Sequence, residues 1–115
     1  MADDSEQGSL HGRIFYRYMS QAEADAIRST GLLRGGRPGR KYWTGASYQT
    51  VDEAKALLAL EYYPEVRLAF RITNNPELLR EGKPVEPDNQ EPGGGTEWMA
   101  LDPVEVEVIA VDNLE

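Results

Sequence analysis

The sequence of 115 residues contains no cysteine and only one histidine, His11. The lack of cysteine excludes disulfide bonds, thiolate metal ligands and a cysteine nucleophile. A single histidine cannot form a multi-histidine metal site, and it leaves few ways to build a Ser-His-Asp triad. We therefore expect no metal in this protein.

Long apolar runs are also missing. No stretch approaches the roughly 18 apolar residues that a membrane-spanning helix needs, so we expect no membrane association. The first residues, MADDSEQGS, are polar and acidic, which is typical of neither a signal nor a transit peptide. We expect a flexible leader over residues 1–12 and a single domain over residues 13–115.

Positive charge is scarce overall and is concentrated near the N-terminus. The formal net charge of -8 repels nucleic acid and argues against a non-specific DNA or RNA binder. Of the 12 basic residues, seven precede residue 42: Arg13, Arg17, Arg28, Arg34, Arg37, Arg40 and Lys41. A local basic pocket in an acidic protein suits a small anionic ligand better than a polyanion.

The spacing of apolar and turn-forming residues predicts an α+β domain. Ser20 with Glu23 and Thr50 with Glu53 are capping-box pairs, which predict helices near 20–30 and 50–61. Gly31 is expected to end the first helix, and Pro64 the region of the second. The predicted strands are residues 13–19, 65–73, 96–101 and 104–111, and residues 42–48 start as a short strand that breaks at Gly45. Two helices in the first half and strands in the second indicate a mainly antiparallel sheet, with Asp102-Pro103 as a tight connection between the last two strands.

Two segments rich in glycine and proline interrupt these elements. RGGRPGRK, residues 34–41, is either a flexible solvated connection or a loop that contacts phosphates, because glycines expose backbone N–H groups. Residues 74–95 contain four prolines and four glycines and predict a long, mostly irregular loop. Loops of this length in compact domains are often functional.

Two charged residues are candidates for a site. Glu97 follows three glycines and a threonine, and it is either a solvated residue of an edge strand or a functional carboxylate. Arg17 shares one face of the first strand with Phe15 and Met19. Because a buried charge is costly without a partner, Arg17 is expected to be paired or to line a cleft.

Several segments carry a resemblance through their order and spacing. They are FYRYMS (15–20), AIRSTGLLRGGRPGRKYWTGASY (26–48), PGGGTEW (92–98) and the final PVEVEVIAV (103–111). The first resembles the opening strand of arginine-containing ADP-ribosyltransferases, and the third resembles their strand that presents the catalytic glutamate. Together the segments are similar to ADP-ribosyltransferase-like toxin domains at the C-termini of Rhs/YD-repeat polymorphic toxins.

The resemblance implies an ADP-ribosyltransferase-like fold and an enzyme that consumes NAD, as an ADP-ribosyltransferase or an NAD glycohydrolase. Arg17 would hold the phosphates or orient the ribose, Thr44 or Ser47 would support the site, and Glu97 would be the catalytic carboxylate. An aromatic face for nicotinamide is available at Tyr42, Trp43, Tyr48 and Trp98. The full set of implied NAD-binding residues is Arg17, Tyr18, Tyr42, Trp43, Thr44, Ser47 and Tyr48.

The resemblance also implies a secreted or delivered toxin of interbacterial competition. It would act in the cytoplasm of a target cell, and the producing cell would hold a cognate immunity protein. The acceptor of ADP-ribose stays open between protein, nucleic acid, small molecule and water. Two alternatives stay open as well: a small metal-independent ribonuclease toxin, and a non-enzymatic binding module whose VEVEV strand offers an edge for pairing.

Overall fold

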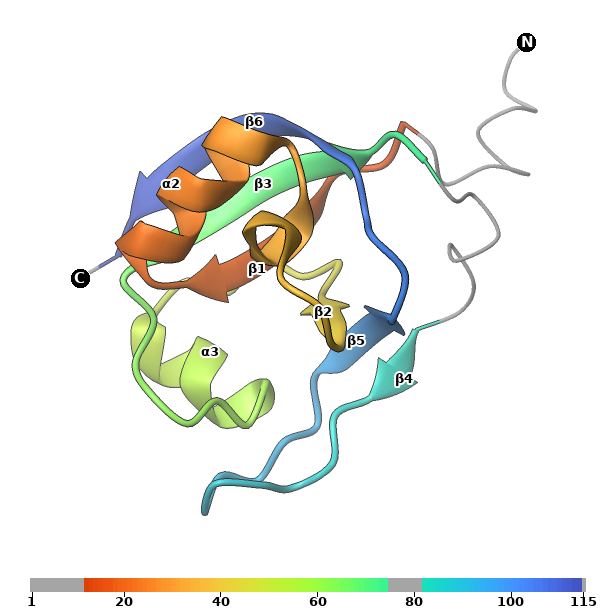
Figure 1. Cartoon of the computed structure of the whole chain (residues 1–115). Helices are drawn as coiled ribbons and strands as arrows, with labels where there is room; N and C mark the ends of the chain where they lie inside the picture. Colours follow the sequence, from red (N-terminus) through yellow and green to blue (C-terminus); the bar gives the residue numbers. More distant parts are fainter. Residues whose placement is uncertain (1–11, 75–81, 115) are drawn as a thin grey trace, which may run out of the picture.

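The computed structural model describes residues 12–74 and 82–114, so His11 and nearly all of the predicted leader lie outside the described residues. The described chain is an α+β fold with two helices and two antiparallel sheets (Figure 1). Its elements in chain order are β1 (Phe15–Met19), α2 (Gln21–Thr30), the 3-10 turn η1 (Leu33–Gly36), β2 (Lys41–Trp43), α3 (Val51–Leu57), β3 (Val66–Ile72), β4 (Lys83–Pro84), β5 (Thr96–Ala100) and β6 (Val106–Asn113).

The first sheet has the strand order β1-β3-β6, with β3 at its centre. The strand predicted over residues 65–73 is confirmed, and its alternate side chains Val66, Leu68, Phe70 and Ile72 are each at most 2% exposed. β3 pairs antiparallel with both neighbours, and its register with β6 shifts at Ala69. This fully paired strand is the centre of the hydrophobic core.

The second sheet has the order β2-β5-β4, and an isolated β-bridge links it to the first sheet. Tyr16 of β1 and Thr44, just after β2, exchange two backbone hydrogen bonds of 2.7 and 2.9 Å. Phe15 packs edge-on against both Trp43 and Trp98, at ring-centroid distances of 6.3 and 5.1 Å. An aromatic cluster therefore fixes how the two sheets meet.

Helix α2 begins and ends where its capping residues predict. The Ser20 hydroxyl accepts a hydrogen bond from the Glu23 amide at 3.2 Å, and Gly31 adopts a left-handed φ of 73° at the C-terminal end. Ala24 and Ile27 are buried, and the helix lies across the first sheet (Figure 1). The Glu23 carboxylate, however, pairs with Arg17.

Helix α3 is shorter than predicted, and the prediction that Pro64 ends this region is wrong. Thr50 caps the helix as expected, but the helix ends at Leu57. The carbonyls of Ala56 and Leu57 accept hydrogen bonds of 2.9 Å from the amides of Gly93 and Gly95. Because a distant loop satisfies these terminal carbonyls, the chain leaves the helix early.

The segment between the last two strands is also different from the expected tight connection. β5 and β6 belong to different sheets, so residues 101–105 cross from one sheet to the other. On the way, the Val104 carbonyl accepts a hydrogen bond from the Leu33 amide at 3.0 Å, and β6 starts only at Val106.

Among the described residues, no helix has the length and apolar character needed to cross a membrane.

Candidate functional site

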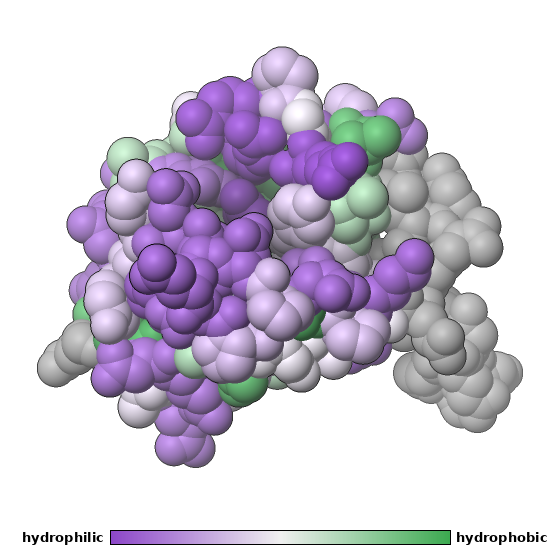
Figure 2. All heavy atoms as spheres, turned by 90° about the horizontal axis from the view of Figure 1, so that it is seen from below, coloured by the Kyte–Doolittle hydropathy of each residue, from purple (hydrophilic) through white to green (hydrophobic). Residues whose placement is uncertain are grey.

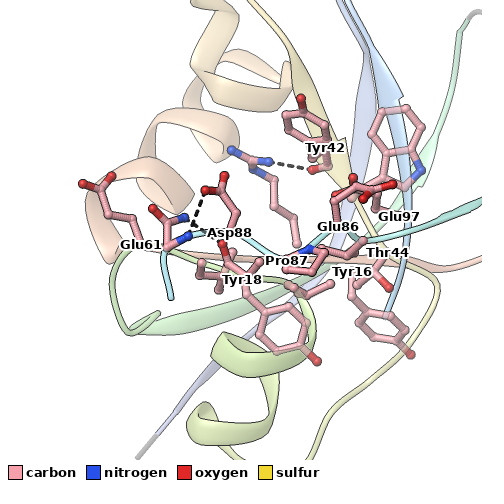
Figure 3. Close-up of a pocket in the computed structure, with 16 residues that line it drawn as sticks. Tyr16, Tyr18, Tyr42, Thr44, Glu61, Glu86, Pro87, Asp88 and Glu97 are labelled. Atoms are coloured by element: carbon pink, nitrogen blue, oxygen red, sulfur yellow. Dashed lines mark hydrogen bonds between the residues drawn. The ribbon is translucent and has the colours of Figure 1, made fainter. Parts of the chain in front are cut away.

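A cavity of about 490 Å³ opens where β1, β2 and β5 meet the loops that follow α3 and β4 (Figure 3). Both residues that the sequence selected as catalytic candidates, Arg17 and Glu97, line it. The described residues that line it are Tyr16, Arg17, Tyr18, Tyr42, Trp43, Thr44, Leu58, Ala59, Leu60, Glu61, Val85, Glu86, Pro87, Asp88, Asn89 and Glu97. Its size suits a small-molecule ligand, for which cavities of roughly 300 to 1,000 Å³ are usual.

Arg17 is held rigidly at the edge of β1. Its Nε donates to Oε2 of Glu23 at 2.8 Å, and its Nη1 donates to the backbone carbonyl of Tyr42 at 2.6 Å. The Arg17 and Glu23 side chains are 17% and 14% exposed, so water screens this ion pair only partly. Nη2 has no hydrogen-bond partner among the described residues, which leaves one end of the guanidinium available to a ligand.

Glu97 has the opposite character, because its carboxylate is half-buried and unpaired. Within the described part of the chain, no hydrogen bond or ion pair engages its side chain. Burial raises the pKa of Glu97 above its ordinary value of 4.5, since the charged form loses hydration without gaining a partner. A carboxylate in this state is available to stabilise positive charge in the cavity.

Two of the three glycines before Glu97, Gly93 and Gly95, have a packing role. The segment runs against the end of α3, and a Cβ on Gly95 would lie 2.5 Å from the Tyr48 hydroxyl and 3.0 Å from the Leu57 carbonyl. A Cβ on Gly93, whose φ is 71°, would lie 2.5 Å from the Val85 carbonyl. Glycine is therefore needed for the backbone to come close enough for these contacts, and Glu97 is positioned from this anchor.

We expect Gly95→Ala to destabilise the protein by about 1–3 kcal/mol, because the added methyl group has to displace backbone atoms of Leu57. Urea unfolding measures the effect. Gly12→Ala is the matched control, since its Cβ would meet nothing within 4 Å. Equal stability of the two variants would contradict the proposed anchoring role.

Glu97 also gives the folding stability a pH dependence of defined sign. With its pKa raised in the folded state, the folded protein binds this proton more tightly than the unfolded chain. Its contribution to the free energy of unfolding therefore falls as the pH rises above 4.5 through the folded-state pKa. Glu97→Gln removes this contribution, so the stability of the variant relative to wild type should be higher at about pH 8 than at about pH 4 in urea unfolding. A difference that does not change with pH would contradict the prediction.

The charge of the cavity differs from the basic pocket that the sequence predicts. Among the described residues, four carboxylates line it, from Glu61, Glu86, Asp88 and Glu97, against the single cation Arg17. In the view of Figure 3, Glu61 and Asp88 lie to the left and Glu86 and Glu97 to the right. Much of the face in Figure 2 is hydrophilic.

The RGGRPGRK loop is not part of this cavity, because none of residues 34–41 lines it. Arg34 turns back on its own loop and donates to the Pro38 carbonyl at 2.7 Å. Lys41 is 3% exposed and donates from Nζ to the Leu101 carbonyl at 2.8 Å. Arg34 and Lys41 therefore support local structure, and the predicted phosphate contact by this loop has no counterpart at the cavity.

The loop between β4 and the glycines forms one wall of the cavity. Asn89 donates from its side chain to the Ala59 carbonyl at 2.8 Å, and Lys55 of α3 forms an ion pair with Glu91. Asn89 and Gln90 have φ values of 52° and 64°, which close a tight turn between Asp88 and Glu91. The sequence predicts a functional loop here but does not indicate which of its residues reach the site.

The residues predicted to bind NAD divide into two groups. Tyr18, Tyr42, Trp43 and Thr44 line the cavity together with Arg17, whereas Ser47 and Tyr48 do not. Ser47 instead accepts a hydrogen bond from Arg67, and the ring of Tyr48 packs on that of Tyr18. The two tryptophans, Trp43 and Trp98, are at most 8% exposed. Trp98 is therefore a core residue, and Trp43 reaches the cavity from the core.

No protein-family model, curated protein or solved structure matches this chain. Residues 12–74 and 82–114 also contain no group of three acidic or histidine side chains that could hold a metal ion. The chemistry of the cavity is that of the fixed Arg17 guanidinium, the half-buried Glu97 carboxylate, aromatic walls and an exposed acidic rim, which is formed by Glu61, Glu86 and Asp88.

Proposed function

We propose that this domain cleaves the bond between nicotinamide and ribose in NAD, as an ADP-ribosyltransferase or an NAD glycohydrolase with an ADP-ribosyltransferase-like fold. In this proposal it is the toxin domain of an interbacterial competition system, delivered to the cytoplasm of a target cell and held inactive in the producer by an immunity protein. The observation that supports the proposal most is that a fixed Arg17 and an unpaired Glu97 line one cavity of suitable size.

The charges of NAD suit this cavity in two places. Its pyrophosphate is anionic and needs a donor such as Nη2 of Arg17, whose planar guanidinium is already oriented by two other hydrogen bonds. Its oxidised nicotinamide ring is positively charged and is attracted by the carboxylates of the rim. Because those carboxylates repel the pyrophosphate, Arg17 has to supply most of the attraction that binds it.

Glu97 would act on the reacting ribose. When the C1′–N bond breaks, its electron pair goes to the nicotinamide nitrogen, and C1′ is left with oxocarbenium-like positive charge. An ionised Glu97 close to C1′ stabilises that charge, and the stabilisation is strong because the carboxylate is partly withdrawn from water. Water or an acceptor group then forms the new bond to C1′ and loses its proton.

Thr44 and Tyr42 would support the site as parts of its wall. Thr44 is 1% exposed, its hydroxyl accepts from the Ala46 amide at 3.2 Å, and its backbone pairs with Tyr16. The Tyr42 carbonyl holds Arg17, and the Tyr42 side chain is 37% exposed beside the cavity. In this arrangement, Thr44 fixes the geometry and Tyr42 is available to pack against nicotinamide.

Turnover of NAD tests the proposal. The purified domain is incubated with NAD, and free nicotinamide is separated and quantified by chromatography, with a parallel incubation with purified RNA and no cofactor. Nicotinamide release with intact RNA is the expected result. RNA cleavage without nicotinamide release would favour the ribonuclease, although the acidic rim repels a phosphate backbone.

One observation supports the non-enzymatic alternative. β6 is at the edge of the first sheet and pairs only with β3 among the described strands, so its other edge offers backbone groups to an extended peptide. This alternative replaces the enzymatic proposal if the domain neither releases nicotinamide nor cleaves RNA. Variants of Arg17 and Glu97 should then bind a protein partner with the affinity of the wild type.

A further inference from the structure

The outer face of β2 and β5 carries an apolar strip that starts at the cavity. Side chains alternate along β5, so Glu97 and Met99 share one face, while Trp98 and Ala100 are buried on the other. The exposed Leu101 directly follows the end of the strand. Tyr42 of β2 is the cross-strand partner of Met99. We call Tyr42, Met99 and Leu101 the outer strip, and their exposed fractions are 37%, 45% and 62%.

The outer strip is continuous with the cavity. Tyr42 and Glu97 line the cavity, and Met99 is on the same face of β5 as Glu97. With a rise of roughly 3.3 Å per residue, Met99 lies about 7 Å along β5 from Glu97, and Leu101 follows just after the strand ends. Neighbouring exposed apolar side chains of this kind are characteristic of interaction surfaces.

The mouth of the cavity, beside this strip, is negatively charged. Glu61, Glu86 and Asp88 line the cavity and are exposed to solvent. None of the three forms an ion pair with a described residue, and the side chain of Asp88 accepts only the neighbouring amide of Asn89, at 2.8 Å. We call these three residues the acidic mouth.

We propose that the outer strip and the acidic mouth together are the docking surface for a protein segment that carries a lysine or arginine next to apolar residues. The basic side chain enters the acidic mouth, and the apolar neighbours cover Met99 and Leu101. Charge complementarity selects this occupant, because nucleic acids and anionic membranes would be repelled by the same carboxylates. If the proposed function is correct, the docked segment belongs to the target that the enzyme modifies; that identification rests on the proposed function.

Peptide binding in the absence of NAD tests the docking surface. The probe is a short fluorescent peptide with one arginine between leucines, and the reference is the same peptide with glutamine in place of arginine. Fluorescence anisotropy should give about tenfold tighter binding of the arginine peptide, which the double variant Glu86→Gln, Asp88→Asn should largely remove. Equal binding of the two peptides, or no binding, would overturn the proposal.

Three aspartate variants locate the contact. Met99→Asp and Leu101→Asp should each weaken binding of the arginine peptide by about tenfold, as expected when a contact residue at an interface is lost. Ile109→Asp is the matched control, because Ile109 is 40% exposed but belongs to β6 of the other sheet. If the Ile109 variant loses as much affinity as the other two, the outer strip is not the contact.

The NAD assay separates this inference from the proposed function. Neither Met99 nor Leu101 lines the cavity, so their variants should release nicotinamide at the wild-type rate when no peptide is present. NAD turnover without selective peptide binding would overturn the docking surface alone. Selective peptide binding without NAD turnover would support the docking surface and overturn the enzymatic proposal.

Discussion

Replacing Glu97 by glutamine is expected to lower the rate of nicotinamide release by about 100-fold to 1,000-fold. Glutamine has nearly the same shape, but it carries no charge with which to stabilise the oxocarbenium-like ribose. Loss of one preorganised electrostatic group at a reacting centre typically costs this much. Release of nicotinamide from saturating NAD, followed by chromatography, measures the rate.

Two controls give this result its meaning. Glu107→Gln makes the same chemical change on β6. The Glu107 side chain is 60% exposed, and its Oε1 lies 3.7 Å from Nη1 of Arg71, which makes a weak surface ion pair. The rate of nicotinamide release by this variant should therefore stay within about twofold of wild type. The Glu97 variant should also unfold no more easily than wild type at neutral pH, because it removes a carboxylate whose pKa is raised by burial. A Glu97 variant that keeps full activity while folded would exclude Glu97 as the catalytic carboxylate.

The sequence predicts those elements whose causes are local. The burial pattern of β3 follows from alternation within residues 66–72, and the start of α2 follows from the hydroxyl of Ser20, which caps the next residues of the chain. Gly31 ends α2 because only glycine takes its left-handed conformation without cost. In each case the determining contact lies within a few positions along the sequence.

Elements that depend on distant contacts were predicted less well. α3 ends at Leu57 because the amides of Gly93 and Gly95 reach its last carbonyls, and no residue near Leu57 in the sequence signals that contact. The separation of β5 and β6 into two sheets depends in the same way on the pairing of Leu33 with Val104. Hydrogen bonds between remote segments override the local pattern at both places.

The same distinction holds at the cavity. Arg17 and Glu97 were predicted because each stands out from its own surroundings, the first within an apolar strand and the second after three glycines. Glu86 and Asp88 lie in a polar loop where a carboxylate is ordinary, so nothing local marks them as cavity residues. The cluster of basic residues before position 42 was misleading because neighbours in sequence point to different parts of the structure, as Arg34 and Lys41 do.

Replacing Arg17 by lysine is expected to raise the KM for NAD by about 10-fold to 100-fold with a smaller change in kcat. Arginine can bind Glu23 and the Tyr42 carbonyl and still present Nη2 to a phosphate, because its donors are spread over three nitrogens of a planar fork. The three donors of an ammonium group diverge from one nitrogen and do not reproduce this geometry. A loss that appears mainly in KM indicates a group that binds ground state and transition state alike, as expected for a contact to the pyrophosphate. Initial rates of nicotinamide release over a range of NAD concentrations give both constants.

Two further variants show whether the orientation of Arg17 matters. Glu23→Gln keeps an acceptor for Nε but removes the charge of the ion pair, so it should raise KM by only about threefold. Arg71→Lys is the matched control, since Arg71 does not line the cavity and should leave both constants unchanged. If Arg17→Lys instead lowered kcat and left KM unchanged, Arg17 would act on the reacting ribose. The phosphates of NAD would then need another partner, and the described residues that line the cavity offer no second cation.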